Sequence, residues 1–383
     1  MTSNQPVLLE DTTLREGEQT PGVVFTEWQK HEIVASLLAA GINHIEIGIP
    51  VMGGQEERSI SSLARQFPNA TLIGWNRGVK EDLQRAIGTG VRAIHIGLPS
   101  SRVHLDQLYA KSHSWVIETA TELVEHARTN GIEFISVSAE DMGRADRTFL
   151  CEYARALAAA GATRLRLSDT VGCLRPGQVT DIVRAIKQSS TIPLQLHMHN
   201  DFGLAVANVL AGLEGGAEQV HTTINGIGER AGIAALHQVV LAIEVLVGRP
   251  TGVRCESLAA LSELVSKCTG HGIPHNEPVL GSHVFTHESG IHVNGMLQLE
   301  SSFEPFPPKL VGRSHKFVLG KHSGSQAIVH LLSQAGVLLT REQARVLLPT
   351  FRELAIELGG IIPLNVAALV ARQLLQLNEQ ATT

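Results

Sequence analysis

The sequence predicts an α/β protein whose first part is a (β/α)8 TIM barrel, followed by a small lid region and a C-terminal helical segment. Eight short apolar runs alternate with amphipathic stretches, which is the pattern of eight strands each followed by a helix. This alternation ends after Arg249-Pro250. The eight runs are VLLEDTT (7–13), HIEIGIP (44–50), TLIGWN (71–76), AIHIGLP (93–99), EFISVSA (133–139), RLRLSDT (164–170), PLQLHMH (193–199) and QVHTTIN (219–225).

Glycine precedes four of the predicted strands, in LLAAGINHIEIGIP, AIGTGVRAIHIGLP, LAAAGATRLRLSDT and LEGGAEQVHTTI. Glycine suits the left-handed residue that ends a helix. The apolar, β-branched run that follows each glycine is typical of a strand buried on both faces. The stretches 26–40 and 112–129 are amphipathic and predict helices between strands. An open doubly wound sheet is the alternative, but it usually carries a glycine-rich phosphate fingerprint, and none follows an early strand here.

The same patterns predict three segments. Residues 1–250 form the catalytic TIM barrel, and residues 251–320, rich in Gly, Pro and His, form a lid or linker subdomain. Residues 321–383 form the C-terminal helical segment, within which 340–360 has clear helical character.

Composition narrows the classes of function. A formal net charge of -6 argues against a nucleic-acid-binding protein, which needs a basic patch. No apolar stretch reaches the length of a membrane span, and the first residues lack the features of a secretory signal. Four cysteines without a CxxC pair indicate reduced thiols, so we expect a cytoplasmic protein.

Polar side chains at the predicted strand ends indicate a metal site. His197 and His199 end strand 7 and point the same way, because alternate strand residues share a face. Glu16 follows strand 1, which only strand 8 separates from strand 7. Two imidazoles and a carboxylate form a divalent metal site with open positions, and the set suits Mg²⁺, Mn²⁺ or Zn²⁺. The alternative is a chance pair among 18 histidines, with Glu16 paired to Arg15 or Arg58.

Two further groups of residues are candidates for the chemistry. The other polar residues at strand ends are Arg15, Gln19, Arg77, His95, Glu140, Asp141, Asp169, Thr170 and the turn NGIGERAG (225–232). The predicted lid carries His283, His287, Glu288 and His292. This lid cluster is either a second structural metal site, a set of solvated histidines, or the source of a general base with an imidazole near its usual pKa.

Six motifs resemble the 2-isopropylmalate synthase and homocitrate synthase family of acetyl-CoA-condensing enzymes. They are DTTLREGEQTPG, SDTVG, HMHNDFGLAVAN, NGIGERAG, FTHESGIHV and LGKHSG, and they run from residue 8 to about residue 325. FTHESGIHV and LVGRSHKFVLGKHSG are most similar to the homocitrate synthases associated with nitrogenase cofactor assembly. The resemblance implies an acyltransferase that condenses acetyl-CoA with 2-oxoglutarate.

The resemblance also implies roles for individual residues. Glu16, His197 and His199 would bind the metal, which the 2-oxo acid chelates through its carboxylate and keto oxygens. Arg15 would stabilise the negative charge that builds on the keto oxygen. Gln19 and Thr170 would hold the substrate carboxylate.

His292 would take a proton from the acetyl-CoA methyl group, helped by Glu140 or Glu288. In this family the lid reaches into the barrel of a partner subunit, so the resemblance implies a homodimer with exchanged lids.

The sequence departs from the family pattern at several positions. Isopropylmalate synthases have aspartate at Glu16 and a further ligand, asparagine, at Ile233. They also carry a long leucine-sensing domain, whereas about 60 residues follow LGKHSG here, so we expect no leucine feedback. Phe303 falls where the family often has a lid tyrosine, and Ser136 where lysine-pathway homocitrate synthases have an arginine for the distal carboxylate of 2-oxoglutarate. Candidates for that second role are Arg77, His95, Ser138 and Arg144.

Several other functions compete with homocitrate synthesis. An isopropylmalate or citramalate synthase would use 2-oxoisovalerate or pyruvate with the same machinery. A carbon–carbon lyase of the hydroxymethylglutaryl-CoA lyase or oxovalerate aldolase type would share the metal ligands, but the lid and LGKHSG favour condensation. A metal-dependent amidohydrolase would carry its His-x-His on strand 1. An inactive relative has only Phe303 and Ile233 in its support.

Overall fold

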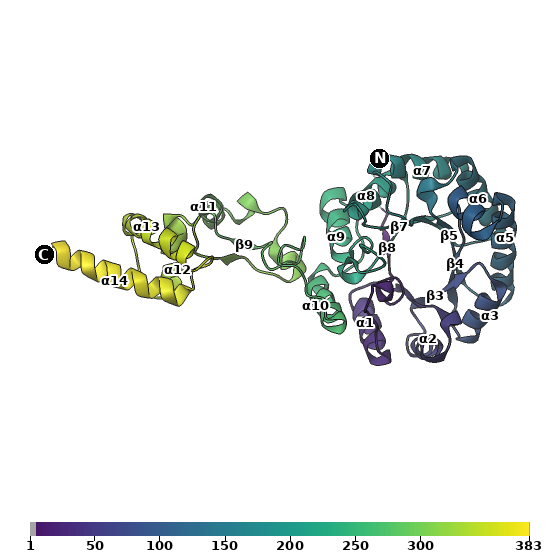
Figure 1. The fold of residues 1–383 in the computed structure, drawn as a ribbon, viewed down its shortest axis with the longest axis horizontal. Coiled ribbons are helices and arrows are strands. Elements are labelled where there is room, and N and C mark those ends of the chain that lie inside the picture. The colour runs from purple at the N-terminus through teal and green to yellow at the C-terminus, as the bar shows by residue number, and fades with distance from the viewer. Residues whose placement is uncertain (1–4, 383) are drawn as a thin grey trace. The chain divides into compact units, whose positions relative to one another are not determined.

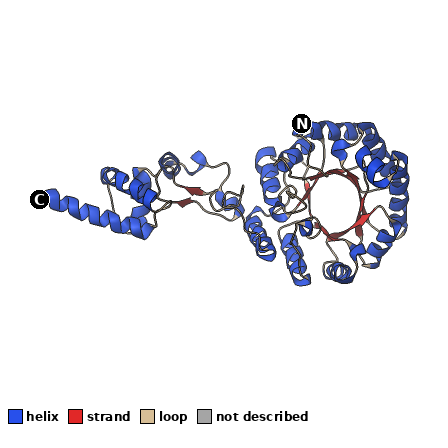
Figure 2. Ribbon diagram, viewed as in Figure 1, coloured by secondary structure: helices blue, strands red, loops and turns tan. Residues whose placement is uncertain are grey.

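The computed structural model describes residues 5–382, with side chains described to residue 376. Eight parallel strands close into a barrel in sequence order, and β8 pairs with β1. Figure 1 shows this ring of strands enclosed by helices, and Figure 2 shows the alternation of strand and helix around it. The predicted TIM barrel is therefore confirmed. The strands are β1 (Leu8–Asp11), β2 (His44–Gly48), β3 (Thr71–Arg77), β4 (Ala93–Gly97), β5 (Phe134–Glu140), β6 (Arg164–Asp169), β7 (Leu194–Met198) and β8 (Gln219–Thr222).

Helices cover the outside of the barrel. They are α1 (Glu27–Ala39), α2 (Gly54–Gln66), α3 (Lys80–Gly88), the short α4 (Arg102–His104), α5 (His113–Thr129), α6 (Arg147–Ala160), α7 (Pro176–Ser189), α8 (Ala205–Gly215), α9 (Leu236–Leu241) and α10 (Leu258–Thr269). Local sequence fixes where they begin. Thr26 and Gln29 form a reciprocal capping box at the start of α1, and the Asp146 carboxylate accepts the Phe149 N–H at the start of α6.

The predicted glycines do lie in the left-handed region where helices end. Gly41, Gly90, Gly161 and Gly216 have φ values of +96°, +85°, +87° and +111°. A side chain with a Cβ is strained in that region, so glycine lets each chain segment turn directly into the next strand.

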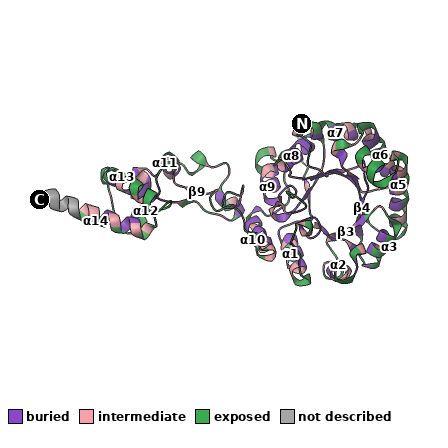
Figure 3. Ribbon diagram, in the orientation of Figure 1, coloured by how far each residue is buried: buried purple, intermediate pink, exposed green. Residues whose placement is uncertain are grey.

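The strands are buried on both faces, as predicted. Every residue of β4, β6 and β7 is buried, and Figure 3 shows the ring of strands in the colour of buried residues. The interior is nevertheless charged: Glu10, Glu46, Arg164 and Arg166 are at most 1% exposed. These side chains contact one another inside the barrel, beneath the strand ends that hold the candidate site.

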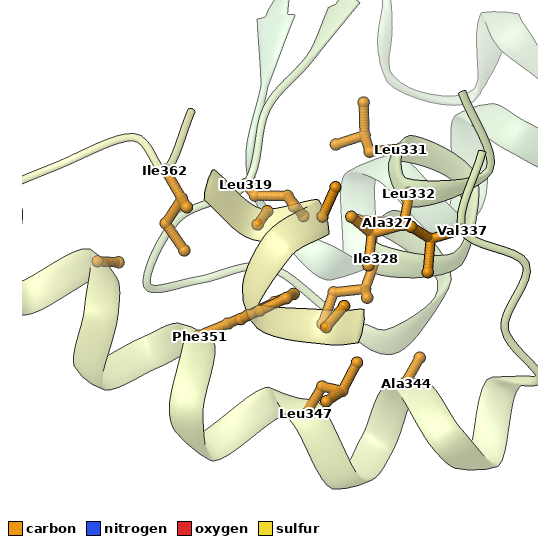
Figure 4. Packing of buried hydrophobic residues seen from close by; sticks show 14 of the residues in the cluster. Leu319, Ala327, Ile328, Leu331, Leu332, Val337, Ala344, Leu347, Phe351 and Ile362 are labelled. Atoms are coloured by element: carbon orange, nitrogen blue, oxygen red, sulfur yellow. The ribbon is translucent and has the colours of Figure 1, made fainter. Parts of the chain in front are cut away.

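The chain divides into two compact units, one ending at Ile273 and the other beginning at Pro274. The second unit contains β9 (Thr286–His287), α11 (Gly290–Gln298), β10 (Lys316–Phe317), α12 (Ser325–Gln334), α13 (Arg341–Glu357) and α14 (Leu364–Thr382). Val293 of α11 and the buried residues of the three following helices share one apolar core. Figure 4 shows Leu332, Leu347 and Phe351 packed within it. The predicted segment boundaries at residues 250 and 320 stay predictions.

No helix among residues 5–382 is both long and apolar enough to cross a membrane.

Candidate metal centre and active site

The three predicted metal ligands lie together at one end of the barrel. His197 is in β7 and His199 follows it, while Glu16 lies in the turn after β1. The structure brings a ligand-type atom of each within 4.8 Å of the others, and all three residues are buried. The two Nε2 atoms are 3.3 Å apart. This convergence follows from the topology, because only β8 separates β7 from β1 in the closed barrel.

The electrostatics of this group fit a divalent cation. Burial lowers the pKa of His199 and holds the pKa of His197 well below its usual value, so both imidazoles are neutral and can offer a lone pair. The Glu16 carboxylate is oriented by the Glu229 N–H at 3.1 Å and by Arg15 at 2.6 Å. Buried neutral nitrogens facing one another beside a carboxylate form a donor set that a divalent metal satisfies.

Glu16, His197 and His199 are called the metal-type cluster below. Arg15 lies between this cluster and the charged interior of the barrel. Its guanidinium binds Glu46, contacts Glu16 and lies 5.8 Å from the Trp75 ring. Although burial disfavours the charge, Glu46 and Glu16 raise the pKa of Arg15, so the side chain stays cationic. Gln19 is exposed and its Oε1 accepts from Arg15 at 3.4 Å. A cavity of about 560 Å³ adjoins Arg15 and Gln19, and Glu16, His197 and His199 are not among the residues that line it.

The remaining predicted barrel residues lie mostly at the strand ends. His95 Nδ1 is 2.8 Å from the Ser136 hydroxyl, and the Ser138 hydroxyl accepts the Leu98 N–H at 3.3 Å. The Thr170 hydroxyl accepts the Asp141 N–H at 2.9 Å.

Glu140 is the candidate acid or base on this side of the barrel. Burial raises the pKa of Glu140, although Arg15 and Arg166 oppose the shift. A Cβ at Gly97 would lie 2.6 Å from its Oε1, so glycine leaves room for this carboxyl group.

Two predicted cations are engaged elsewhere. The Arg77 side chain is 61% exposed and its Nε donates to Asp82 at 2.8 Å, in the first turn of α3. Arg144 forms an ion pair with Asp141 at 2.8 Å. The structure therefore does not bring Arg77 to the metal-type cluster, because Asp82 satisfies its guanidinium outside the barrel mouth.

His292 lies on α11 of the second unit. It is exposed and stacks on Phe303, with ring centroids 4.3 Å apart and an interplanar angle of 17°. The Phe303 ring therefore packs face to face against the imidazole of His292, the predicted base. Glu288 accepts the His322 N–H at 2.9 Å, which ties its carboxylate to the LGKHSG turn. The catalytic role of His292 stays a prediction.

Sequence reasoning missed a charged network beneath the cluster. Arg166 binds Glu10 at 2.7 Å and Glu46 at 2.8 Å, and Arg164 binds Glu10 at 2.5 Å. His221 of β8 contacts His197, with the Nδ1 atoms 2.8 Å apart. The signal was present: RLRL and HIEIG place charges at alternate positions of strands otherwise made of apolar residues.

Ion pairing explains how the network remains charged. Burial opposes the ionisation of Glu46, but Arg15 and Arg166 hold the pKa of this carboxyl group well below its usual range. Burial lowers the pKa of Arg164 to about 10, which leaves it cationic at neutral pH.

A closed barrel with a buried Glu-His-His group and an arginine at the strand ends defines a class of metal-dependent barrel enzymes. Comparison with known proteins identifies the family within this class. The family described as HMGL-like matches residues 7–265, and the domain described as homocitrate synthase post-HMGL domain-like matches residues 279–357. The chain belongs to the HMGL-like family, within the 2-isopropylmalate synthase and homocitrate synthase group, whose members are acyl-CoA-condensing synthases.

Relatives with several product names are similar to this chain. A 2-phosphonomethylmalate synthase from Streptomyces rubellomurinus is 47% identical, over 93% of this chain and 95% of its own. A 2-isopropylmalate synthase from Caldanaerobacter subterraneus is 42% identical, over 93% and 92%. Homocitrate synthase 1 from Nostoc sp. is 40% identical, over 92% and 93%. These comparisons show the reaction class and leave the acceptor open.

Solved structures agree on the fold. The hydroxymethylglutaryl-CoA lyase from Pseudomonas aeruginosa superposes with a TM-score of 0.63 at 22% identity, over 71% of this chain and 96% of its own.

Proposed function

We propose that this chain is a homocitrate synthase, which condenses acetyl-CoA with 2-oxoglutarate and releases CoA. The buried Glu16, His197 and His199 group with the Arg15 guanidinium beside it supports a metal-dependent reaction, and the motifs FTHESGIHV and LVGRSHKFVLGKHSG support homocitrate as the product. A divalent cation held there would supply Lewis acidity toward the acceptor's keto group.

The chain's own residues supply the remaining steps. Arg15 is fixed by Glu46 and Glu16 before substrate arrives, so it stabilises negative charge on the keto oxygen without reorganising. Gln19 and Thr170 orient the acceptor carboxylate. His292 removes a proton from the acetyl methyl group, and Glu140, whose pKa is raised by burial, assists at the barrel mouth.

The products in the relatives' names show how their 2-oxo acid acceptors differ. Homocitrate, isopropylmalate, citramalate and phosphonomethylmalate are all malates substituted at carbon 2, so the acceptors are 2-oxo acids that differ in one group. His95, Ser136 and Ser138 are buried polar residues of the barrel interior, and such residues favour an acceptor group with hydrogen-bond acceptors over an isopropyl group.

Phosphonopyruvate is a second candidate acceptor, supported by the 47% identity to a 2-phosphonomethylmalate synthase. It shares with 2-oxoglutarate a second anionic group. Arg164 and Arg166 are already paired with Glu10 and Glu46, so neither guanidinium is free to bind that group. Neutral donors, the hydroxyls of Ser136 and Ser138 and the His95 ring, would hold it instead.

The test is thiol release from acetyl-CoA with 2-oxoglutarate, phosphonopyruvate, 2-oxoisovalerate and pyruvate, each with and without chelator. Chelator-sensitive turnover with the highest kcat/KM for 2-oxoglutarate supports the proposal. A preference for phosphonopyruvate establishes the second candidate. A preference for 2-oxoisovalerate or pyruvate contradicts the argument from the buried polar residues His95, Ser136 and Ser138.

We also propose that the enzyme is a homodimer whose lids are exchanged. Mixing His199→Ala chains with His292→Ala chains tests it, because a mixed dimer with exchanged lids regains one complete site. Random pairing would then restore about a quarter of the wild-type activity. If each chain used its own lid, the mixture would stay inactive.

We also propose that the homocitrate made by this enzyme is used in nitrogenase cofactor assembly. Deleting the gene should abolish growth on dinitrogen, and added homocitrate should restore it. Unchanged growth on dinitrogen would contradict this cellular role.

A further inference from the structure

His221 is a buried histidine for which the proposed reaction has no role. It lies in β8, is fully buried, and stands opposite Glu10 of β1 in the barrel register. Its Nδ1 is 2.8 Å from Nδ1 of His197, and its Nε2 is 3.2 Å from Glu10 Oε1. His221 therefore bridges a predicted metal ligand and the charged interior of the barrel.

Glu10, Glu46 and His221 also have the composition of a second metal site. The charges around them argue against that use. Arg164 and Arg166 bind Glu10, while Arg166 and Arg15 bind Glu46. Three guanidinium groups already neutralise the two carboxylates, so a divalent cation would meet net positive charge.

The proton positions along this chain of contacts follow from Glu10. Glu10 Oε1 accepts from Arg166 at 2.7 Å, and Oε2 forms an ion pair with Arg164 at 2.5 Å, so the carboxylate is an acceptor. The nitrogen of His221 that faces it must then carry a proton, because two lone pairs would otherwise meet at 3.2 Å.

The remaining nitrogens are then determined. The Nδ1 atoms of His221 and His197 are 2.8 Å apart, so one of these nitrogens donates a hydrogen bond and the other accepts it. With its proton on Nε2, His221 accepts at Nδ1, and His197 donates from its own Nδ1. The lone pair of His197 is thus on Nε2, the atom 3.3 Å from His199 Nε2.

We propose that His221 is a positioning residue that, together with Glu10, fixes the tautomer and ring orientation of His197 so that Nε2 faces the metal site. The inference rests on the proposed metal-binding role of His197 and His199. Outer partners of this kind orient metal-ligating histidines, and their loss weakens metal affinity by about 10- to 100-fold.

Three variants separate the two contacts of His221. His221→Asn keeps an acceptor oxygen near the position of Nδ1 and so preserves the contact with His197. His221→Gln extends its amide toward Glu10 and loses that acceptor, and His221→Leu loses both contacts. His44→Leu is the control, since His44 lies in β2 opposite Glu10 and packs edge-on against Phe134.

The measurement is the dissociation constant of Mn²⁺ by calorimetry on the full chain, with circular dichroism as the check of folding. The visible spectrum of the Co²⁺-loaded protein reports the ligand geometry. We expect His221→Asn and His44→Leu to stay within about threefold of wild type. His221→Gln and His221→Leu should weaken Mn²⁺ binding by about 10- to 100-fold. If the Leu variant does not fold, the comparison of Asn with Gln decides the question.

Two results would overturn the inference. One is wild-type Mn²⁺ affinity in the Gln and Leu variants while His199→Ala has lost binding, which would leave the metal site intact as a proposal. The other is an equal loss in folded Asn and Gln variants, which would show that the acceptor toward His197 is not what matters. If His199→Ala itself retained full affinity, the proposed metal site would fail with it.

Discussion

The barrel interior and the core of the second unit are built on opposite principles. Beneath the metal-type cluster, Glu10, Glu46 and Arg166 are at most 1% exposed and held by ion pairs. In the second unit, Leu332 and Phe351 are equally buried but surrounded by aliphatic side chains. Both regions exclude water, but the barrel interior buries ion pairs and the second unit buries apolar side chains.

The difference shows which region fixes reactive groups and which supplies stability. Buried apolar area stabilises by about 25 cal/mol per Å², with no geometric demand on any one atom. Buried ion pairs gain little net stability, but each fixes the direction of its partners. Arg15 is oriented in this way by Glu46. The buried ion pairs of the barrel interior therefore orient side chains but add little to the stability of the fold. Four substitutions test this contrast with the second unit.

The largest effect should come from the metal-type cluster. His199→Ala removes one of three candidate ligands, so we expect loss of measurable Mn²⁺ binding and a fall in turnover of at least about 1,000-fold. Calorimetry and the thiol-release assay measure the two effects. His126→Ala, on α5 outside the barrel, should change neither. Retention of both properties by His199→Ala would refute the ligand assignment.

His292→Ala tests whether the second unit contributes only stability. If His292 is the general base, kcat should fall by about 100- to 10,000-fold while Mn²⁺ and 2-oxo acid binding stay unchanged. Calorimetry with both ligands and the thiol-release assay separate these outcomes. Normal turnover would mean that another residue is the base, with His287 as the next candidate. His292 would then give no reason to assign a catalytic role to the second unit.

Phe351→Ala probes the apolar region directly. Phe351 is 1% exposed in α13, so its truncation should lower the free energy of unfolding by about 3 to 5 kcal/mol. Urea denaturation followed by circular dichroism measures the change. Val346→Ala on the same helix is 61% exposed and should change stability by less than about 0.5 kcal/mol. Equal effects of the two substitutions would mean that this core is not tightly packed.

The sequence predicted the barrel because its pattern is local and repeated. Most residues of the eight strands are buried, and each of the four glycines follows a helix at a positive φ. The second unit was harder to predict. Its buried residues come from α11, α12, α13, α14 and the turns between them, and Val293 joins a core whose other buried members come after residue 318. Contacts at that separation leave no periodic signal.

The candidate site was predictable where spacing alone brings residues together. His197 and His199 share a face by strand alternation, and Glu16 follows from the closure of the barrel. The pairing of Arg77 with Asp82 could not be read from its position at a strand end, and its role in substrate binding stays a prediction. Glu10, Glu46 and His221 were missed because their importance depends on pairing across four strands, which no single strand shows.

The smallest effect concerns Asp11, a buried carboxyl group at the end of β1. Burial raises the pKa of Asp11 to about 7, although the Thr13 N–H donates to its carboxylate. Its ordinary pKa is near 3.9, so between about pH 4 and 7 the folded protein binds more protons at this site than the unfolded chain. Stability from Asp11 is therefore present at low pH and lost as the pH rises toward 7, by at most about 1.4 kcal/mol per pH unit.

Asp11→Asn removes this titration, so its free energy of unfolding should gain on that of wild type as the pH rises from 4.5 to 7. Urea denaturation at several pH values measures the difference, and Glu133→Gln, an exposed carboxyl group at the opposite end of the barrel, should show no such trend. A constant difference between Asp11→Asn and wild type would mean that Asp11 is ionised throughout. The barrel would then compensate even this buried charge, as it compensates Glu10 and Glu46, and the contrast with the second unit would become sharper.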